Sequence, residues 1–260
     1  MILRRVIKHV RNQEWTAIVI DFFIVVFGVF VGLQVQQWNE SRVDEGRAKA
    51  YLSRAQNDLN ADLFDYQIRL DFWEQVSDYG TSGLDYVSTG QVGNSTYWQL
   101  LLAFFHASQV AEFNTTRTTY DELTSSGEQN LITNVKIRDA LANYYSEAGN
   151  ATFTERPKYR ENVRGIIPIS VQSYIWENCY NSDEVGVQEL LNCSTPIAPH
   201  RAEEIVNMIA GNTELMAELR YWMSTMTVAT LIAHTRMKLA NEMLVLIETE
   251  LGSESMEATP

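Results

Sequence analysis

The chain contains 260 residues, of which 45% are hydrophobic and 20% are charged, and its 33 acidic and 20 basic residues give a formal net charge of −13. This composition excludes a disordered chain, because it supplies enough apolar side chains for a core, and it excludes a basic nucleic-acid-binding protein. All five prolines lie at or after Pro157, so the chain before that position lacks the residue that most strongly breaks helices.

Residues 1–14 are predicted to form a basic amphipathic segment in the cytoplasm. The segment contains Arg4, Arg5, Lys8 and Arg11, and apolar residues recur between these cations at near-helical spacing. Cationic segments with an apolar side bind the anionic inner surface of a membrane. We therefore interpret the four cations as membrane anchors.

A transmembrane helix is predicted over residues 15–38. The run Trp15–Val35 has Asp21 as its only charged residue, and at about 1.5 Å per residue it is roughly 31 Å long, close to the ~30 Å of a bilayer's hydrocarbon core. A cleavable signal peptide has a shorter apolar run that is followed by a small-residue cleavage site. Here the run is longer, and no such site follows it. Trp15 and Trp38 bracket the span as interfacial anchors, and the N-terminal cations predict that the N-terminus lies in the cytoplasm.

One face of this span has the composition of a helix-helix contact. Gly28 and Gly32 follow Asp21 by seven and eleven positions, which places Gly28 about 20° to one side of Asp21 and Gly32 about 20° to the other on a helical projection. Two glycines four residues apart allow a second helix to approach closely, and a carboxylate within a bilayer favours a polar partner. The alternative is that the GxxxG spacing is accidental and that Asp21 is hydrated near the membrane surface.

Residues 39–251 are predicted to form a helical domain outside the cytoplasm. Apolar residues at steps of three and four predict a helix that continues from the membrane to about Tyr79. These residues are Leu52, Ala55, Leu59, Leu63, Tyr66, Leu70 and Trp73. A turn-rich stretch is then predicted from the glycines Gly80, Gly83, Gly90 and Gly93.

Shorter helices are predicted next. They begin near Ser95, cover residues 115–127 and begin again near Asn134, and Gly127 is suited to end the second of them in a left-handed conformation. The polar segment from Ser125 to Asn134 has two interpretations, a ligand-binding turn or a pair of helix caps, and we favour the caps. Between Pro157 and Pro199, four prolines predict irregular structure and short helices.

The two cysteines, Cys179 and Cys193, are predicted to form a disulfide, because an exported domain lies in an oxidising compartment. In the chain-entropy model, a ring of about 15 residues contributes about 3 kcal/mol of stability. The alternative is two unrelated buried thiols. A zinc site is disfavoured, because two cysteines without a nearby histidine supply too few ligands.

The clearest helix is the last one, in which apolar residues recur every three or four positions from Leu215 to Leu251. Residues 252–260 are predicted to be a flexible tail. Nowhere do apolar and polar residues alternate over a stretch long enough to predict a sheet. We therefore predict an all-α protein in which one N-terminal transmembrane helix continues into an extracytoplasmic antiparallel bundle, with methionine and aromatic residues filling its core.

Several segments resemble a bacterial family of single-span envelope proteins that is known only as a domain of unknown function. The resemblance rests on GVFVGLQVQQWNE at 28–40, YLSRAQNDLNADL at 51–63, SSGEQNLI at 125–132 and RDALANYY at 138–145. It covers about residues 20–145 and does not include the cysteines. The resemblance implies an inner-membrane anchor and a helical exported domain, and it supplies no catalytic residues.

No motif in the sequence indicates an enzyme. The histidines His9, His106, His200 and His234 form neither HExxH nor the Glu-x-x-His repeat of di-iron bundles, and no GxSxG element or phosphate-binding glycine loop is present. We expect no catalytic residues, no metal and no cofactor.

The sequence therefore predicts a non-enzymatic, single-pass protein of a bacterial inner membrane, with its main domain in the periplasm. We expect an accessory, assembly or stabilising subunit. Its partners would be the lipid bilayer and either other integral membrane subunits or a second copy of itself, bound through the transmembrane helix, and not nucleic acid. One alternative is a periplasmic sensor or ligand-binding bundle that acts through a partner, and another is an envelope enzyme of unrecognised type.

Overall fold

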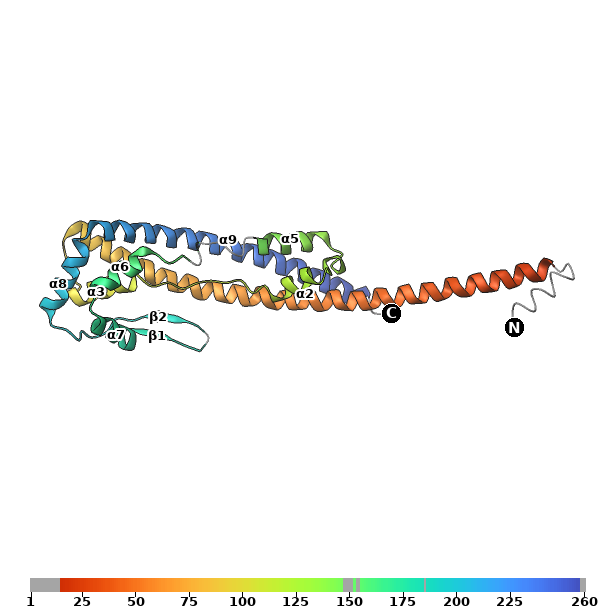
Figure 1. The fold of residues 1–260 in the computed structure, drawn as a ribbon, viewed down its shortest axis with the longest axis horizontal. Coiled ribbons are helices and arrows are strands. Elements are labelled where there is room, and N and C mark those ends of the chain that lie inside the picture. The colour runs from red at the N-terminus through yellow and green to blue at the C-terminus, as the bar shows by residue number, and fades with distance from the viewer. Residues whose placement is uncertain (1–14, 147–151, 153–154, 185, 258–260) are drawn as a thin grey trace.

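A computed structural model describes residues 15–146, 152, 155–184 and 186–257. These residues contain eight α-helices, one short 3-10 helix and two short strands (Figure 1). The helices are α2 (Trp15–Thr89), α3 (Tyr97–His106), α4 (Thr118–Ser125), α5 (Val135–Ser146), α6 (Lys158–Ile166), α7 (Ile169–Asn178), α8 (Pro199–Ala210) and α9 (Thr213–Glu257). The 3-10 helix η1 covers Gln129–Leu131, and the strands are β1 (Tyr180–Ser182) and β2 (Gln188–Leu190). The expectation of a mainly helical protein is confirmed.

Helix α2 is a single rod of 75 residues, about 110 Å long at the usual helical rise. It passes through Gly80 and Gly83, where the sequence predicted turns, and it ends before Gly90, whose φ of 68° is left-handed. The prediction of turns at Gly80 and Gly83 was wrong because these glycines serve close packing. A Cβ added at Gly83 would lie 2.8 Å from the ring of Phe104, and one at Gly80 would overlap the side chain of Met223.

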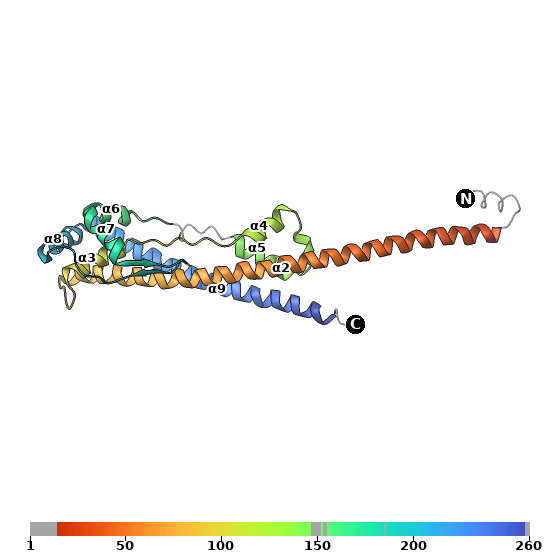
Figure 2. The same cartoon turned by 90° about the horizontal axis from the view of Figure 1, so that it is seen from below.

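Helix α9 runs back along α2 in the opposite direction, and the two form the backbone of the folded domain (Figures 1 and 2). α9 has 45 residues and ends at Glu257, so its backbone extends into the segment 252–260 for which the sequence predicted a flexible tail. Residues 258–260 lie outside the described residues. The apolar first part of α2 projects beyond the end of α9, and no other described element lies beside it in either view.

Two apolar cores lie along this helix pair. The proximal core is nearer the apolar end of α2 and joins α2, α4, α5 and α9 around side chains such as Leu59, Leu141 and Ile247. The distal core joins α2, α3, α6, α7, α8 and α9 around side chains such as Trp73 and Trp222. The α2 and α9 stripes predicted from spacing supply one wall of each core.

The predicted helix caps are confirmed. Gly127 follows α4 with a φ of 73°, and the side-chain oxygen of Asn134 accepts a hydrogen bond from the Lys136 amide at 3.1 Å before α5. The cap interpretation of the segment from Ser125 to Asn134 therefore accounts for its polar residues. Thr96 and Gln99 form a capping box at the start of α3.

The expectation of no sheet was wrong in one place. β1 and β2 form an antiparallel hairpin with Tyr180 opposite Leu190 and Ser182 opposite Gln188. Each strand has only three residues, too few to show an alternating pattern in the sequence. Cys179 and Cys193 flank this hairpin and are bonded as a disulfide with a Cα–Cα distance of 5.3 Å, which is the predicted pairing.

Candidate functional site

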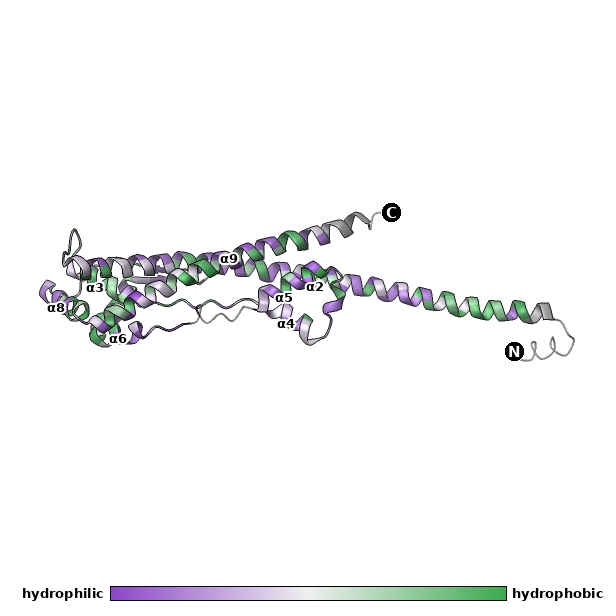
Figure 3. Ribbon diagram, turned by 90° about the horizontal axis from the view of Figure 1, so that it is seen from above, coloured by the Kyte–Doolittle hydropathy of each residue, from purple (hydrophilic) through white to green (hydrophobic). Residues whose placement is uncertain are grey.

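The first part of α2 is an apolar helix that no other described part of the molecule covers. Every residue from Phe22 to Arg47 is exposed, and hydrophobic colour predominates along α2 near its N-terminal end in Figure 3. Among the described residues, α2 is the one helix that is long and apolar enough to cross a membrane. An isolated helix that is apolar on all sides requires a non-aqueous environment or a protein partner.

The three residues of the predicted contact face lie on this uncovered part of α2. Because the helix is continuous from Trp15, Asp21, Gly28 and Gly32 share one face as the spacing predicted. A Cβ added at either glycine would meet no atom within 4 Å. The face is thus open to a second helix, and its role as a contact stays a prediction.

The predicted membrane anchors are described only in part. Trp38 is 63% exposed, and the guanidinium of Arg42 lies 5.1 Å from the centre of its ring, so the indole is paired with a cation just after the apolar run. Trp15 is the first residue of α2, but its side chain lies outside the described residues. Arg4, Arg5, Lys8 and Arg11 also lie outside them.

A buried polar network connects the proximal and distal cores. The carboxylate of Asp62 accepts hydrogen bonds from the Thr116 amide at 2.7 Å and from the Tyr144 hydroxyl at 2.8 Å. Burial raises the pKa of Asp62 and, more strongly, that of Tyr144. Arg236, which is 4% exposed, donates to the main-chain oxygen of Tyr144 at 3.3 Å. The network ties α2, α5 and α9 together, and its burial leaves no access for a substrate.

A second polar cluster lies where α3 ends against α6. Arg160 donates to the Ser108 carbonyl at 2.8 Å, and Arg164 donates to the Gln109 side-chain oxygen at 3.1 Å. Burial lowers the pKa of both arginines, that of Arg164 to about 10. The neighbouring His106 is fully buried, and neither of its ring nitrogens has a hydrogen-bond partner among the described residues. Burial lowers the pKa of His106 to about 4, so its imidazole is neutral at pH 7.

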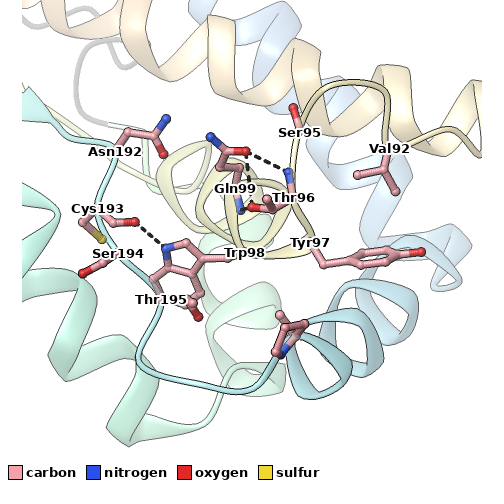
Figure 4. A pocket seen from close by; sticks show the side chains of 12 residues that line it. Val92, Ser95, Thr96, Tyr97, Trp98, Gln99, Asn192, Cys193, Ser194 and Thr195 are labelled. Carbon is pink, nitrogen blue, oxygen red and sulfur yellow. Dashed lines mark hydrogen bonds between the residues drawn. The ribbon is translucent and has the colours of Figure 1, made fainter.

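A groove with a volume of about 670 Å³ lies between α3, the segment after β2 and the start of α8 (Figure 4). These elements are at the end of the domain far from the apolar part of α2 (Figure 1). Tyr97 and Trp98 of α3 and Pro199 of α8 supply apolar surface. Uncharged polar residues complete the wall, namely Ser95, Thr96, Gln99, Asn192, Ser194 and Thr195. None of the described residues that line the groove is charged, and the groove therefore suits an uncharged ligand.

The disulfide shapes one wall of this groove. Cys193 contributes to the lining, and its carbonyl accepts a hydrogen bond from the Trp98 indole N–H at 2.8 Å (Figure 4). Ser194 is bound to the Tyr174 hydroxyl at 3.1 Å. These contacts hold the segment after β2 against α3 and α7, so the cysteine pair has a definite structural role.

Among the described residues, no group of three or more His, Cys, Asp or Glu side chains is placed to hold a metal ion. His106, His200 and His234 belong to α3, α8 and α9, respectively. His200 and His234 are exposed whereas His106 is buried, so these three do not share one environment. His9 lies outside the described residues.

The sequence reasoning missed both polar clusters. Asp62 was recognisable in principle, because it lies three residues after Leu59 and four before Tyr66, on the apolar stripe of α2. The spacing of four residues between Arg160 and Arg164 was also recognisable in the sequence. Their position beside the end of α3 depends on the folded chain, and no local pattern in the sequence indicates it.

No family model, no curated protein and no solved structure matches this chain.

Proposed function

We propose that this protein is a non-enzymatic, single-pass accessory or assembly subunit of a bacterial inner membrane. The apolar part of α2 crosses the bilayer and contacts a second transmembrane helix, either of another subunit or of a second copy. The helical domain lies in the periplasm and presents an acidic surface to partners.

The observation that supports this proposal is the contrast along α2. Every residue from Phe22 to Arg47 is exposed, whereas the proximal core begins at Tyr51 and covers one side of the helix from there on. Because the folded domain covers only the later part of α2, the apolar surface of the first part needs a partner outside the domain. Bilayer lipid and a neighbouring helix together would cover the apolar surface of the first part of α2.

The helix also fixes the distance between bilayer and domain. From the end of the apolar run at Val35 to Tyr51, α2 continues without a break for about 24 Å at the usual rise. Ion pairs stiffen this part, because Lys49 binds Glu45 at 2.6 Å and Arg47 contacts Glu128 of the loop after α4. A rigid spacer of this length is suited to hold a domain beside the exported parts of another membrane protein.

The disulfide and the charge distribution support a periplasmic location. A bonded cysteine pair that positions the segment after β2 persists in an oxidising compartment, and the cations before the span favour a cytoplasmic N-terminus. Both features agree with export of the domain.

The lateral contact is tested by purifying the protein from its native membrane in mild detergent and identifying the proteins that co-elute in stoichiometric amount. The variant Gly28→Leu/Gly32→Leu fills the proposed contact face, and Phe30→Leu is the matched control, since Phe30 lies opposite Asp21 on the helix. We expect the double variant to lose a companion or a self-associated form that wild type and control retain. Elution of all three proteins as the same lone monomer would contradict the contact.

A second candidate function, a periplasmic ligand-binding bundle, is favoured by the uncharged groove beside Trp98. Native mass spectrometry of protein purified from its own membrane tests this function. A bound uncharged molecule that is lost on Ala202→Trp, which fills the groove, would support it. A chain without a bound molecule, together with an intact companion protein, would favour the accessory subunit.

A further inference from the structure

Arg160 and Arg164 of α6 bear positive charges that no described carboxylate neutralises. Some other arginines form ion pairs, such as Arg54 with Glu122 at 2.7 Å and Arg156 with Glu112 at 2.9 Å. Arg164 instead has Arg160 as an unfavourable neighbour, which lowers the pKa of Arg164 further, and the charge of Arg156 lowers the pKa of Arg160. In a chain with 33 acidic residues and a net charge of −13, two adjacent unpaired guanidinium groups are an unusual arrangement.

The contacts of these arginines within the fold use only part of each guanidinium. Arg160 donates through Nη1 to the Ser108 carbonyl, and Arg164 donates through Nε and Nη2 to the side chains of Ser108 and Gln109. These bonds cap the carboxyl end of α3, whose dipole compensates about half a charge. Nε and Nη2 of Arg160 and Nη1 of Arg164 make no hydrogen bond to the described residues. The fold thus holds both guanidinium groups in place, and each still has N–H donors that can bind another molecule.

Apolar side chains lie directly beside one of these charges, that of Arg164. The Arg164 guanidinium stacks 4.9 Å from the ring centre of Phe105 and 5.3 Å from that of Trp176. Trp176 is 36% exposed, and Ile169, which lies seven residues earlier on α7, is 76% exposed. Seven residues are almost two turns, so both side chains lie on the same side of α7. Arginine stacked on a partly exposed tryptophan is the composition typical of residues that dominate binding at protein interfaces.

We propose that Arg160, Arg164 and Trp176 form a docking surface for a short segment of a partner protein that presents two carboxylates beside an apolar side chain. The two guanidinium groups would bind the carboxylates, and Trp176 with Ile169 would cover the apolar side chain. Long polyanions such as nucleic acid are repelled by the net charge of the chain, whereas a short acidic segment is attracted locally. The surface lies on α6 and α7, far from the apolar arm of α2 (Figures 1 and 2). The proposal deepens the proposed function by naming a second contact with partners, and it rests on that function.

The test uses the full-length oxidised chain in nonionic detergent and two fluorescein-labelled peptides. Both are short Ser/Gly peptides, one with a central Glu-Leu-Glu and the other with Gln-Leu-Gln, and binding is measured by fluorescence anisotropy at low salt. We expect the Glu peptide to bind at least about tenfold more tightly than the Gln peptide, because charge-assisted bonds to arginine are the stronger ones. The preference falls as NaCl is added, and equimolar inorganic phosphate does not remove it.

Matched variants separate this surface from general charge effects. Arg160→Gln/Arg164→Gln abolishes the preference for the Glu peptide, whereas Arg201→Gln/Arg220→Gln changes the net charge equally and retains it. Because the first pair also removes the cap of α3, Trp176→Ser serves as a second variant that leaves the cap intact, and it weakens binding of both peptides about threefold or more.

Equal affinity for the two peptides, no binding, or equal loss in both arginine pairs would overturn the proposal. Displacement of the peptide by phosphate alone would also overturn it in favour of a small-anion site. Wild type and Gly28→Leu/Gly32→Leu are expected to bind the Glu peptide alike, so failure of the lateral contact in the membrane and failure of this docking surface are distinguishable.

Discussion

The two ends of α2 have the same secondary structure and opposite surroundings. Phe27, near the N-terminal end, is 69% exposed, whereas Phe72, farther along the same helix, is 1% exposed. The N-terminal part is apolar on every side and has no covering element. The later part is apolar on one stripe, which α3 and α9 cover in the distal core.

The difference shows that the distribution of apolar residues around a helix says more about its partner than the overall hydrophobicity of the helix does. A stripe indicates that the partner is another element of the same domain, whereas a fully apolar surface indicates a lipid or external partner. The glycines follow the same division. Gly83 contacts Phe104, whereas Gly28 and Gly32 contact nothing within the described residues.

The largest expected difference comes from truncating one phenylalanine at each end of α2. Phe72→Ala is expected to lower the free energy of unfolding by about 3–5 kcal/mol, because it opens a cavity in the distal core. Phe27→Ala is expected to change it by less than about 0.5 kcal/mol, because no contact of the folded domain is lost. Urea unfolding in detergent, followed by circular dichroism, measures both. A large effect of Phe27→Ala would show that the apolar arm folds against the domain.

The buried part of the molecule is also expected to depend on pH through His106. Its pKa is about 4 in the fold against an ordinary value of 6.5, so between these values the unfolded chain binds more protons. The associated stability is therefore complete above pH 6.5 and is lost as the pH falls from 6.5 to 4, by about 3 kcal/mol. His106→Phe retains the ring contact with Tyr79 and is expected to remove this dependence. The exposed His234→Gln serves as control, and an unchanged slope in His106→Phe would refute the assignment.

Removal of the disulfide tests whether the two cores are independent. Cys179→Ala/Cys193→Ala is expected to cost about 3 kcal/mol through the greater entropy of the unfolded chain. Amide hydrogen exchange is expected to rise along α3 and α7, which the segment after β2 contacts, and to change little around Tyr145 in the proximal core. An equal rise in both cores would show that they unfold as one unit.

The smallest effects come from two glycines on α2. Gly83→Ala is expected to destabilise the domain by about 1–3 kcal/mol, because the added methyl overlaps the Phe104 ring. Gly46→Ala, in an exposed stretch with nothing within 4 Å, is expected to stabilise the helix by up to about 1 kcal/mol. Thermal unfolding in the same detergent compares them. The same sign for both variants would contradict the close packing at Gly83.

The sequence predicts the long helices well, because each has a regular stripe over many turns. The stripe from Leu52 to Trp73 and that from Leu215 to Leu251 lie in α2 and α9 as expected. Gly80 and Gly83 show the limit of this reasoning. A glycine in sequence indicates equally a turn and a close helix contact, and only the neighbouring side chain distinguishes the two.

The sequence predicts a candidate site only where the residues of that site lie close together in one segment of the chain. The cysteine pair and the face of Asp21, Gly28 and Gly32 follow from spacing along one segment. The hairpin of β1 and β2 does not, because it depends on pairing across short strands. Arg160 and Arg164 are recognised only when α6 is placed beside the end of α3, which no periodicity in either helix indicates.

The central claim is that the apolar arm of α2 crosses the inner membrane and leaves the domain outside the cytoplasm. Protease added to intact spheroplasts, with blotting for a C-terminal tag, tests it most directly. We expect loss of the tag and of residues 39–251 while a cytoplasmic marker protein stays intact. Survival of the tagged domain until the membrane is lysed, or a mature chain that begins after residue 38, would contradict the account.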